Sequence, residues 1–187
     1  MKLFAKSAFA ATLLFSFSCG EADSEPKNSD SYIGSWGNGC EAKDEDDYSS
    51  RVFRITESSP ELTITYFSDE TCQSKTKTKV ISYNANFGEK NDNGHNLDIT
   101  MTKEETTYHT QTAVDAENNA EYADYTDWEV GKTRVEPADE LRTFYTIVGL
   151  TSTGQLCVGA APEEGAADGS SPAKRSNTLN TDCFKKR

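Results

Sequence analysis

The chain has 187 residues, of which 31 are acidic and 19 basic, and its formal net charge is −12 at pH 7. Such a charge repels polyanions, so the composition argues against a protein that binds the phosphate backbone of nucleic acids.

The first eighteen residues are organised like a secretory signal. Lys2 and Lys6 are followed by a mostly apolar run over 8–17, and the small Ser18 precedes Cys19. A membrane-spanning helix needs about 20 apolar residues in a row, whereas this run stops at Cys19 and an acidic segment follows it. We therefore expect residues 1–18 to be a cleaved signal peptide. Its loss removes two lysines, which leaves 17 basic against 31 acidic residues and a formal charge of −14.

Residues 16–19, Ser-Phe-Ser-Cys, resemble the lipobox of bacterial lipoproteins. The resemblance implies that Cys19 receives a diacylglyceryl group with palmitate-type chains and becomes the N-terminus of a lipoprotein. The chain has five cysteines, and removing Cys19 leaves the even set expected for two disulfide bonds in an oxidising compartment. The alternative is an ordinary secretory signal cut near Ser18.

The expected location is the cell envelope, with the acylated Cys19 holding the protein at a membrane. Gly20 follows Cys19, in place of the Asp that retains lipoproteins in the inner membrane of some bacteria, so the outer membrane is the default. Whether the protein faces the periplasm or the cell surface stays open.

Residues 19–31 are expected to form a flexible tether, because they contain acidic residues, Ser, Asn and Pro but almost nothing apolar. Residues 32–187 then form a single domain, a length that suits one hydrophobic core.

This domain is predicted to be mainly β, because apolar and polar residues alternate along several segments separated by turn residues. The predicted strands cover 51–55, 62–67, 77–87, 97–102 with an extension to 110, 141–150 and 155–159. Asn93-Gly94, between two of them, favours a hairpin turn. The segment near 112–125 is predicted as a short helix or a long loop, and 160–181 as a long surface loop. The pattern indicates an antiparallel meander.

Four cysteines remain for disulfide bonds, and they allow three pairings. Cys40 is expected to end the first strand and Cys72 the third, whereas Cys157 lies in the last strand and Cys183 in the tail. We therefore predict the bonds Cys40–Cys72 and Cys157–Cys183.

Gly34-Ser35-Trp36, with the meander behind it, resembles the G-x-W opening of lipocalins and of lipocalin-like bacterial lipoproteins. Further segments, including Thr126-Asp127-Trp128 and the stretch 169–175, resemble a group of uncharacterised exported lipoproteins. The resemblance implies a lipocalin-like β-barrel in which Trp36 plugs the closed end. A basic residue from the end of the chain packs over this Trp in lipocalins, and we expect Arg175 to do so.

The sequence contains no recognisable catalytic or metal-binding motif. His95 and His109 lack the spacing of a zinc site, and a triad of His109, Asp127 and a Ser has no nucleophile elbow. The acidic run 44–47 and the half calcium loop at 91–94 are more simply explained as a solvated loop and a turn. We expect neither an enzyme nor a cofactor or metal.

The leading hypothesis is a non-enzymatic lipoprotein that holds a small apolar or amphipathic molecule in its barrel. Four aromatic residues are available to line such a cavity: Tyr66, Tyr83, Phe87 and Phe144. The alternative is a surface interaction or structural lipoprotein that acts through its acidic exterior, with a protein partner that the sequence does not name.

Overall fold

A computed structural model describes residues 31–44, 47–121, 124–138, 143–160 and 168–187. The predicted signal peptide, Cys19 and nearly all of the predicted tether lie outside these residues. Parts of the acidic run, of the 112–125 segment, of the 141–150 strand and of the 160–181 loop also lie outside them.

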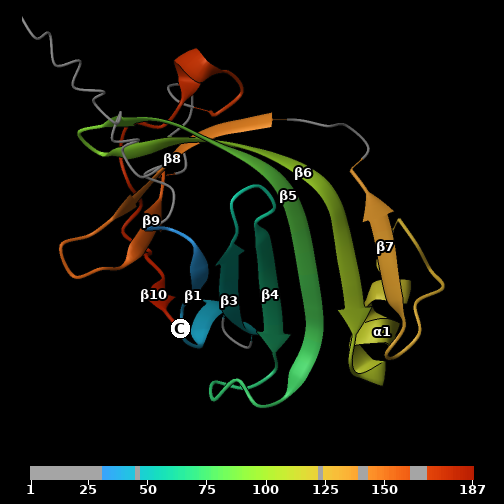
Figure 1. Cartoon of the computed structure of the whole chain (residues 1–187). Coiled ribbons are helices and arrows are strands. Elements are labelled where there is room, and N and C mark those ends of the chain that lie inside the picture. Colours follow the sequence, from blue (N-terminus) through green and yellow to red (C-terminus); the bar gives the residue numbers. More distant parts are fainter. Residues whose placement is uncertain (1–30, 45–46, 122–123, 139–142, 161–167) are drawn as a thin grey trace, which may run out of the picture.

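The described chain is an antiparallel β structure with one α-helix, as predicted (Figure 1). Its strands are β1 (Gly34–Gly37), β2 (Glu41–Asp44), β3 (Asp47–Ile55), β4 (Glu61–Phe67), β5 (Lys75–Asn91), β6 (Gly94–Tyr108), β7 (Thr133–Pro137), β8 (Thr143–Leu150), β9 (Leu156–Val158) and β10 (Lys185–Lys186). The helix α1 spans Gln111–Asn118, and a short 3₁₀ turn spans Pro172–Lys174. Among the described helices, none is long and apolar enough to cross a bilayer.

The strands form one sheet that curves until it nearly closes into a barrel. Its hydrogen-bonded order is β10-β1-β3-β4-β5-β6-β8-β9, with β2 paired to β3 and β7 paired to β6. At the seam, Leu156 of β9 and Phe184 exchange backbone hydrogen bonds of 2.9 and 2.7 Å. Strand β10, which directly follows Phe184, pairs with β1. Figure 1 shows β5 and β6 as long curved strands along one side, opposite this seam. The lipocalin-like barrel expected from the sequence is therefore consistent with the fold.

The hairpin between β5 and β6 is confirmed, but its turn is displaced by one residue. Asn91 pairs with Gly94, so the turn residues are Asp92 and Asn93. The Asn91 side chain accepts a hydrogen bond from the Asn93 amide (2.9 Å), and Gly94 takes a positive φ of 148°. A Cβ at this glycine would meet the carbonyl of Val148, so the close approach of β8 adds a second reason for glycine.

The segment near 112–125 is a short helix followed by a loop. The Thr110 hydroxyl caps α1 by accepting a hydrogen bond from the Ala113 amide (3.2 Å). Val114 is the buried residue of the helix, and it packs with Tyr108 and Trp128 in a small second core.

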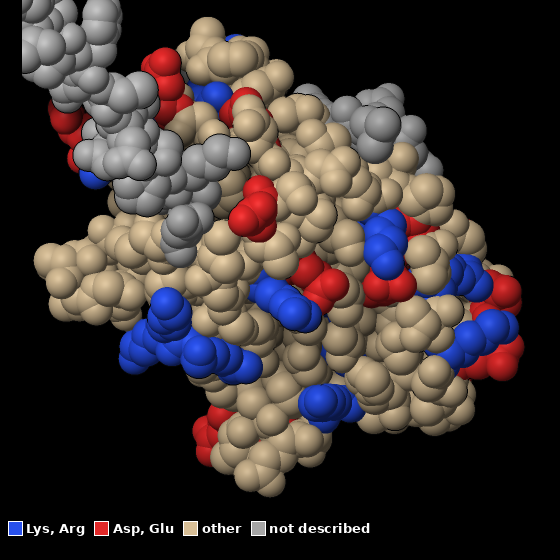
Figure 2. Space-filling model, in the orientation of Figure 1, with Lys and Arg blue, Asp and Glu red and all other residues tan. Residues whose placement is uncertain are grey.

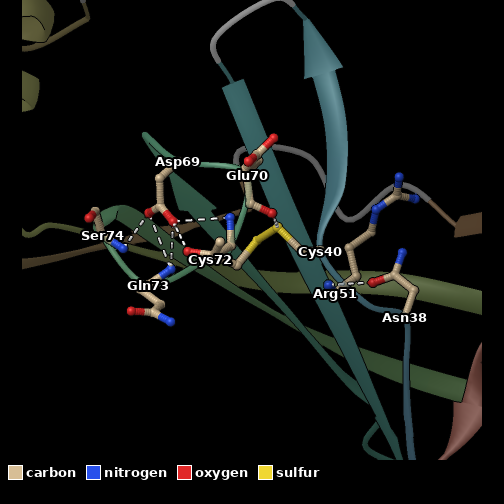
Figure 3. The surroundings of a disulfide bond; sticks show 9 residues. Asn38, Cys40, Arg51, Asp69, Glu70, Cys72, Gln73 and Ser74 are labelled. Atoms are coloured by element: carbon tan, nitrogen blue, oxygen red, sulfur yellow. Dashed lines mark hydrogen bonds between the residues drawn. A yellow bond between two sulfur atoms is a disulfide. The ribbon is translucent and has the colours of Figure 1, made fainter.

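Both predicted disulfide bonds are confirmed. Cys40–Cys72 joins the connection before β2 to the loop before β5 (Figure 3). In this loop Cys72 has a positive φ of 52°, and the Asp69 carboxylate accepts hydrogen bonds from the amides of Gln73 and Ser74. The Thr71 hydroxyl and these backbone donors hold the pKa of Asp69 well below its ordinary value. Cys157–Cys183 lies beside the Leu156–Phe184 pair and fastens the barrel seam.

Loss of the seam disulfide is expected to lower the free energy of unfolding by about 3.5 kcal/mol, because the bond closes a loop of 26 residues. Cys157→Ser and Cys183→Ser should each show this loss in urea denaturation. The double variant should cost little more than either single change, since the first already opens the loop. Additive losses would contradict the pairing, and Cys40→Ser combined with Cys157→Ser serves as the additive control.

Candidate ligand-binding site in the barrel

The inner face of the sheet changes from apolar to charged along the strands. The strand register places Phe53 opposite Leu62, and Leu97 opposite Phe87. These side chains pack with buried Trp36 at one end of the barrel. Toward the other end, Lys79 lies opposite Thr106 and Lys77 opposite Tyr108. An apolar end and a polar end therefore share one continuous interior.

A pocket of about 210 Å³ lies in the interior between these ends and the barrel seam. Its lining combines apolar and aromatic side chains with three polar ones: Arg51, Phe53, Leu62, Tyr83, Val158, Asn180, Asp182 and Phe184. The rings of Phe53 and Phe184 lie 6.3 Å apart at a tilted angle. We call this cavity the seam pocket, because Val158 and Phe184 belong to the two segments that meet at the seam.

The polar groups around the seam pocket differ in charge and burial. The Arg51 guanidinium lies 3.7 Å from the Glu41 carboxylate, so its charge is partly compensated. Burial, and then the nearby Glu104, raise the pKa of Tyr83 to about 12. Its phenol, like that of any tyrosine near neutral pH, is protonated and can donate a hydrogen bond. The pocket thus offers apolar surface together with hydrogen-bond donors and acceptors.

Trp36 is only 2 % exposed, as expected for a plug, and its indole nitrogen donates a 2.7 Å hydrogen bond to the Tyr32 carbonyl. The cation near its ring is not Arg175, so that prediction is wrong. The Lys186 ammonium lies 5.5 Å from the ring centroid instead. The reason is topological: β10 pairs with β1 and places Lys186 directly opposite Trp36.

Arg175 binds at the β6–β8 junction. Its guanidinium donates to the carbonyls of Leu97 (3.1 Å) and Thr146 (2.7 Å), and to the Asp98 carboxylate (2.6 Å). The side chain is 14 % exposed and its cation lies 5.5 Å from the Tyr145 ring. Arg175 therefore joins the C-terminal segment to the two strands rather than covering the plug.

The four aromatic residues predicted to line a cavity are separated in the structure. Tyr83 lines the seam pocket. Phe87 is packed against the apolar core, where it stacks on Tyr32 at 6.0 Å. Tyr66 borders a different pocket, next to α1, and Phe144 is 42 % exposed beside Gly169.

The charged end of the interior is partly covered by α1. Here a pocket of about 270 Å³ is bordered by Tyr66, Lys77, Tyr108 and Glu117, among others. The Lys77 ammonium lies 4.5 Å from the Tyr66 ring centroid, and burial lowers its pKa. Tyr108 donates a 2.6 Å hydrogen bond to Glu117, and burial together with this bond raises the pKa of Tyr108. The hydrogen bond between Tyr108 and Glu117 joins β6 to α1.

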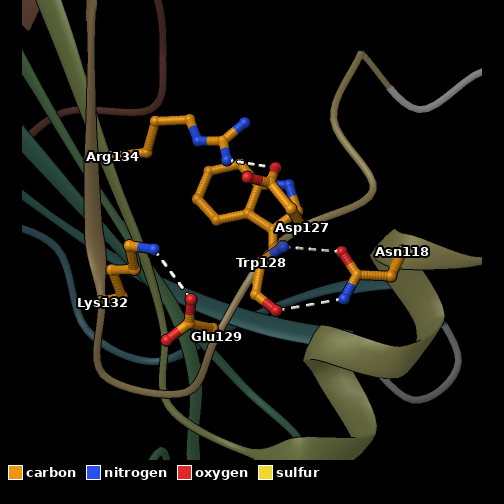
Figure 4. Close-up of polar contacts among 6 residues, drawn as sticks. All are labelled: Asn118, Asp127, Trp128, Glu129, Lys132 and Arg134. Carbon is orange, nitrogen blue, oxygen red and sulfur yellow. Dashed lines mark hydrogen bonds and ion pairs between the residues drawn. The ribbon is translucent and has the colours of Figure 1, made fainter.

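Beside α1, Arg134 of β7 lies next to Trp128 and Asp127 (Figure 4). The Arg134 guanidinium lies 3.8 Å from the Tyr125 ring centroid and 4.6 Å from that of Trp128, and it contacts Asp127 at 2.5 Å. The Asn118 side chain exchanges hydrogen bonds with the backbone of Trp128. Trp128 is thus a structural core residue of this second cluster.

Sequence reasoning missed several seam-pocket residues, including Arg51, Val158 and Phe184. Arg51 lies two residues before Phe53, so strand alternation could have placed it on the inner face. No alternating pattern marks Phe184, because the strand that follows it, β10, is only two residues long.

The two histidines have structural contacts. His95 is buried edge-on to Tyr32, and its Nδ1 lies 3.3 Å from the Gly88 carbonyl. His109 Nε2 is 2.8 Å from the Thr78 hydroxyl. Within the described ranges, no group of three or more His, Cys, Asp or Glu residues is placed to hold a metal ion.

A scan against protein-family models finds no match, and a search of curated proteins finds no similar chain.

Proposed function

We propose that this protein is a lipid-anchored, non-enzymatic lipoprotein of the cell envelope that binds a small apolar or amphipathic molecule in its barrel. The observation that carries the proposal is the seam pocket, where Phe53, Leu62 and Phe184 provide apolar surface beside Arg51 and Tyr83. A few polar groups set in an apolar lining are typical of small-molecule sites.

The size of the seam pocket limits the ligand. Its volume of about 210 Å³ lies below the roughly 300 to 1,000 Å³ of sites for drug-sized molecules. The ligand is therefore a smaller molecule, or a longer chain of which only one end enters. Its apolar part would contact the two phenylalanines, and its polar part would face Arg51 and Asn180.

The alternative, an interaction protein that acts through its acidic exterior, gains no specific support. On the face shown in Figure 2, acidic side chains are dispersed among other residues rather than gathered into one surface.

Filling the seam pocket is expected to abolish ligand binding. Val158→Phe adds volume to the lining, so a fluorescent fatty acid, whose chain end can enter the pocket, should bind at least about tenfold more weakly, as the loss of its apolar contacts predicts. Val135→Phe is the matched control, because Val135 lies on β7 and is 54 % exposed. Equal probe affinity in the two variants, with both folded by circular dichroism, would contradict the proposal.

Cys19→Ala is expected to abolish acylation. Metabolic labelling with an alkyne fatty acid should mark the wild type and not the variant, because the lipobox thiol is the proposed acceptor. Cys40→Ser with Cys72→Ser is the control and should keep the label, since those sulfurs form a disulfide bond. Label retained in Cys19→Ala would show that the lipobox interpretation is wrong.

A further inference from the structure

The chain ends in three consecutive basic residues, Lys185, Lys186 and Arg187, which we call the C-terminal basic strand. All three are exposed. Seven ion pairs join other basic side chains of the described residues to carboxylates, and none of them includes these three. In a chain with a net charge of −12, these are three cations that no side-chain carboxylate of the described residues pairs with.

Figure 2 shows how charged side chains are distributed on this side of the molecule. A cluster of blue side chains lies at the corner where Figure 1 marks the C-terminus, and no red side chain lies within it. Elsewhere on the same face, blue and red side chains lie mostly next to each other.

The topology places the C-terminal basic strand where the chain enters the barrel. Lys186 pairs with Trp36 and Lys185 with Gly37, and the Arg187 amide donates a 2.9 Å hydrogen bond to the Ser35 carbonyl. Arg187 therefore lies beside Ser35 of β1, and Ser35 is only three residues after Tyr32 in the sequence.

The distance to the proposed anchor is correspondingly short. Tyr32 is thirteen residues from Cys19, and a chain of that length spans at most about 45 Å when fully extended. An acylated Cys19 would therefore keep this end of the barrel near the membrane. Basic residues close to an anionic bilayer are attracted within roughly one Debye length, about 8 to 10 Å.

We propose that the C-terminal basic strand docks the barrel on the anionic phospholipid headgroups of the membrane that holds the anchor. This inference rests on the anchor of the proposed function. The overall negative charge opposes adsorption in other orientations, so docking selects the face that carries the basic strand. Phe184, adjacent to this strand, lines the seam pocket, so the docked protein holds that pocket beside the bilayer.

The test uses chain 19–187 with Cys19→Ser, which contains the whole described fold but lacks the lipid. Its flotation is measured with phosphatidylcholine vesicles, with and without about 30 % phosphatidylglycerol, at low and high salt. We expect binding only to the anionic vesicles and at low salt. Lys185→Gln with Arg187→Gln should lower the partition coefficient about 25-fold, because each basic residue near such a surface contributes about fivefold.

Lys75→Gln with Lys90→Gln is the matched control. Both lysines are exposed, neither takes part in an ion pair between described residues, and the change in net charge is the same. Equal losses for the two double variants, or no preference for anionic vesicles, would overturn the proposal. This assay needs no acylation, so a failure of docking is distinct from a failure of the Cys19 labelling experiment.

Discussion

Trp36→Ala is expected to lower the free energy of unfolding by about 3 to 5 kcal/mol, as truncation of large buried aromatic side chains does. The indole is 2 % exposed and packs with Phe53, Ile55 and Leu97, so its removal leaves a cavity at the end of the barrel. It also leaves the Tyr32 carbonyl without its 2.7 Å donor. Urea denaturation followed by circular dichroism measures the loss.

Trp128→Ala is the control for this prediction. Trp128 is 8 % exposed and belongs to the smaller second core, with Tyr108 and Val114. A smaller loss is expected there, because fewer buried apolar groups surround the ring. A loss for Trp36→Ala below about 2 kcal/mol would contradict its role as the plug.

The sequence predicts those strands in which apolar and polar residues alternate because one face of the strand is buried. The central strands β3 to β6 alternate clearly, because one face of each strand packs on the core, and they were predicted close to their observed positions. The strand β7 was missed since its inward positions carry Arg134 and Glu136, which pair with Thr106 and Glu104. Charged side chains on the inner face remove the signal on which such a prediction depends.

The seam was the second part that sequence patterns did not reveal. β10 has two residues, both lysines, and it exists because the Cys157–Cys183 bond and the Phe184–Leu156 pair hold the tail beside β9 and β1. The cysteine positions predicted the bond but not the strand beyond it. For this reason the seam pocket, which needs Phe184, was not foreseen, and Arg175 was assigned to a position that Lys186 occupies.

Arg175→Met is expected to cost about 3 to 5 kcal/mol, as for removal of one partner of a largely buried ion pair. Methionine keeps most of the apolar stem but removes the donors to the Leu97 and Thr146 carbonyls and to Asp98. Arg175→Lys should recover only part of this loss, because a single ammonium cannot reach three acceptors in the geometry of a planar guanidinium. Thermal and urea unfolding measure both variants.

Variants of Lys186 and Arg175 test which of these two cations lies beside the Trp36 ring. The indole N–H resonance of Trp36 should shift in Lys186→Met, since the ammonium lies 5.5 Å from that ring. It should stay in place in folded Arg175→Lys, because the Arg175 guanidinium binds at the β6–β8 junction next to Tyr145. A shift in the second variant and none in the first would restore Arg175 as the residue over Trp36 and would contradict the pairing of β10 with β1.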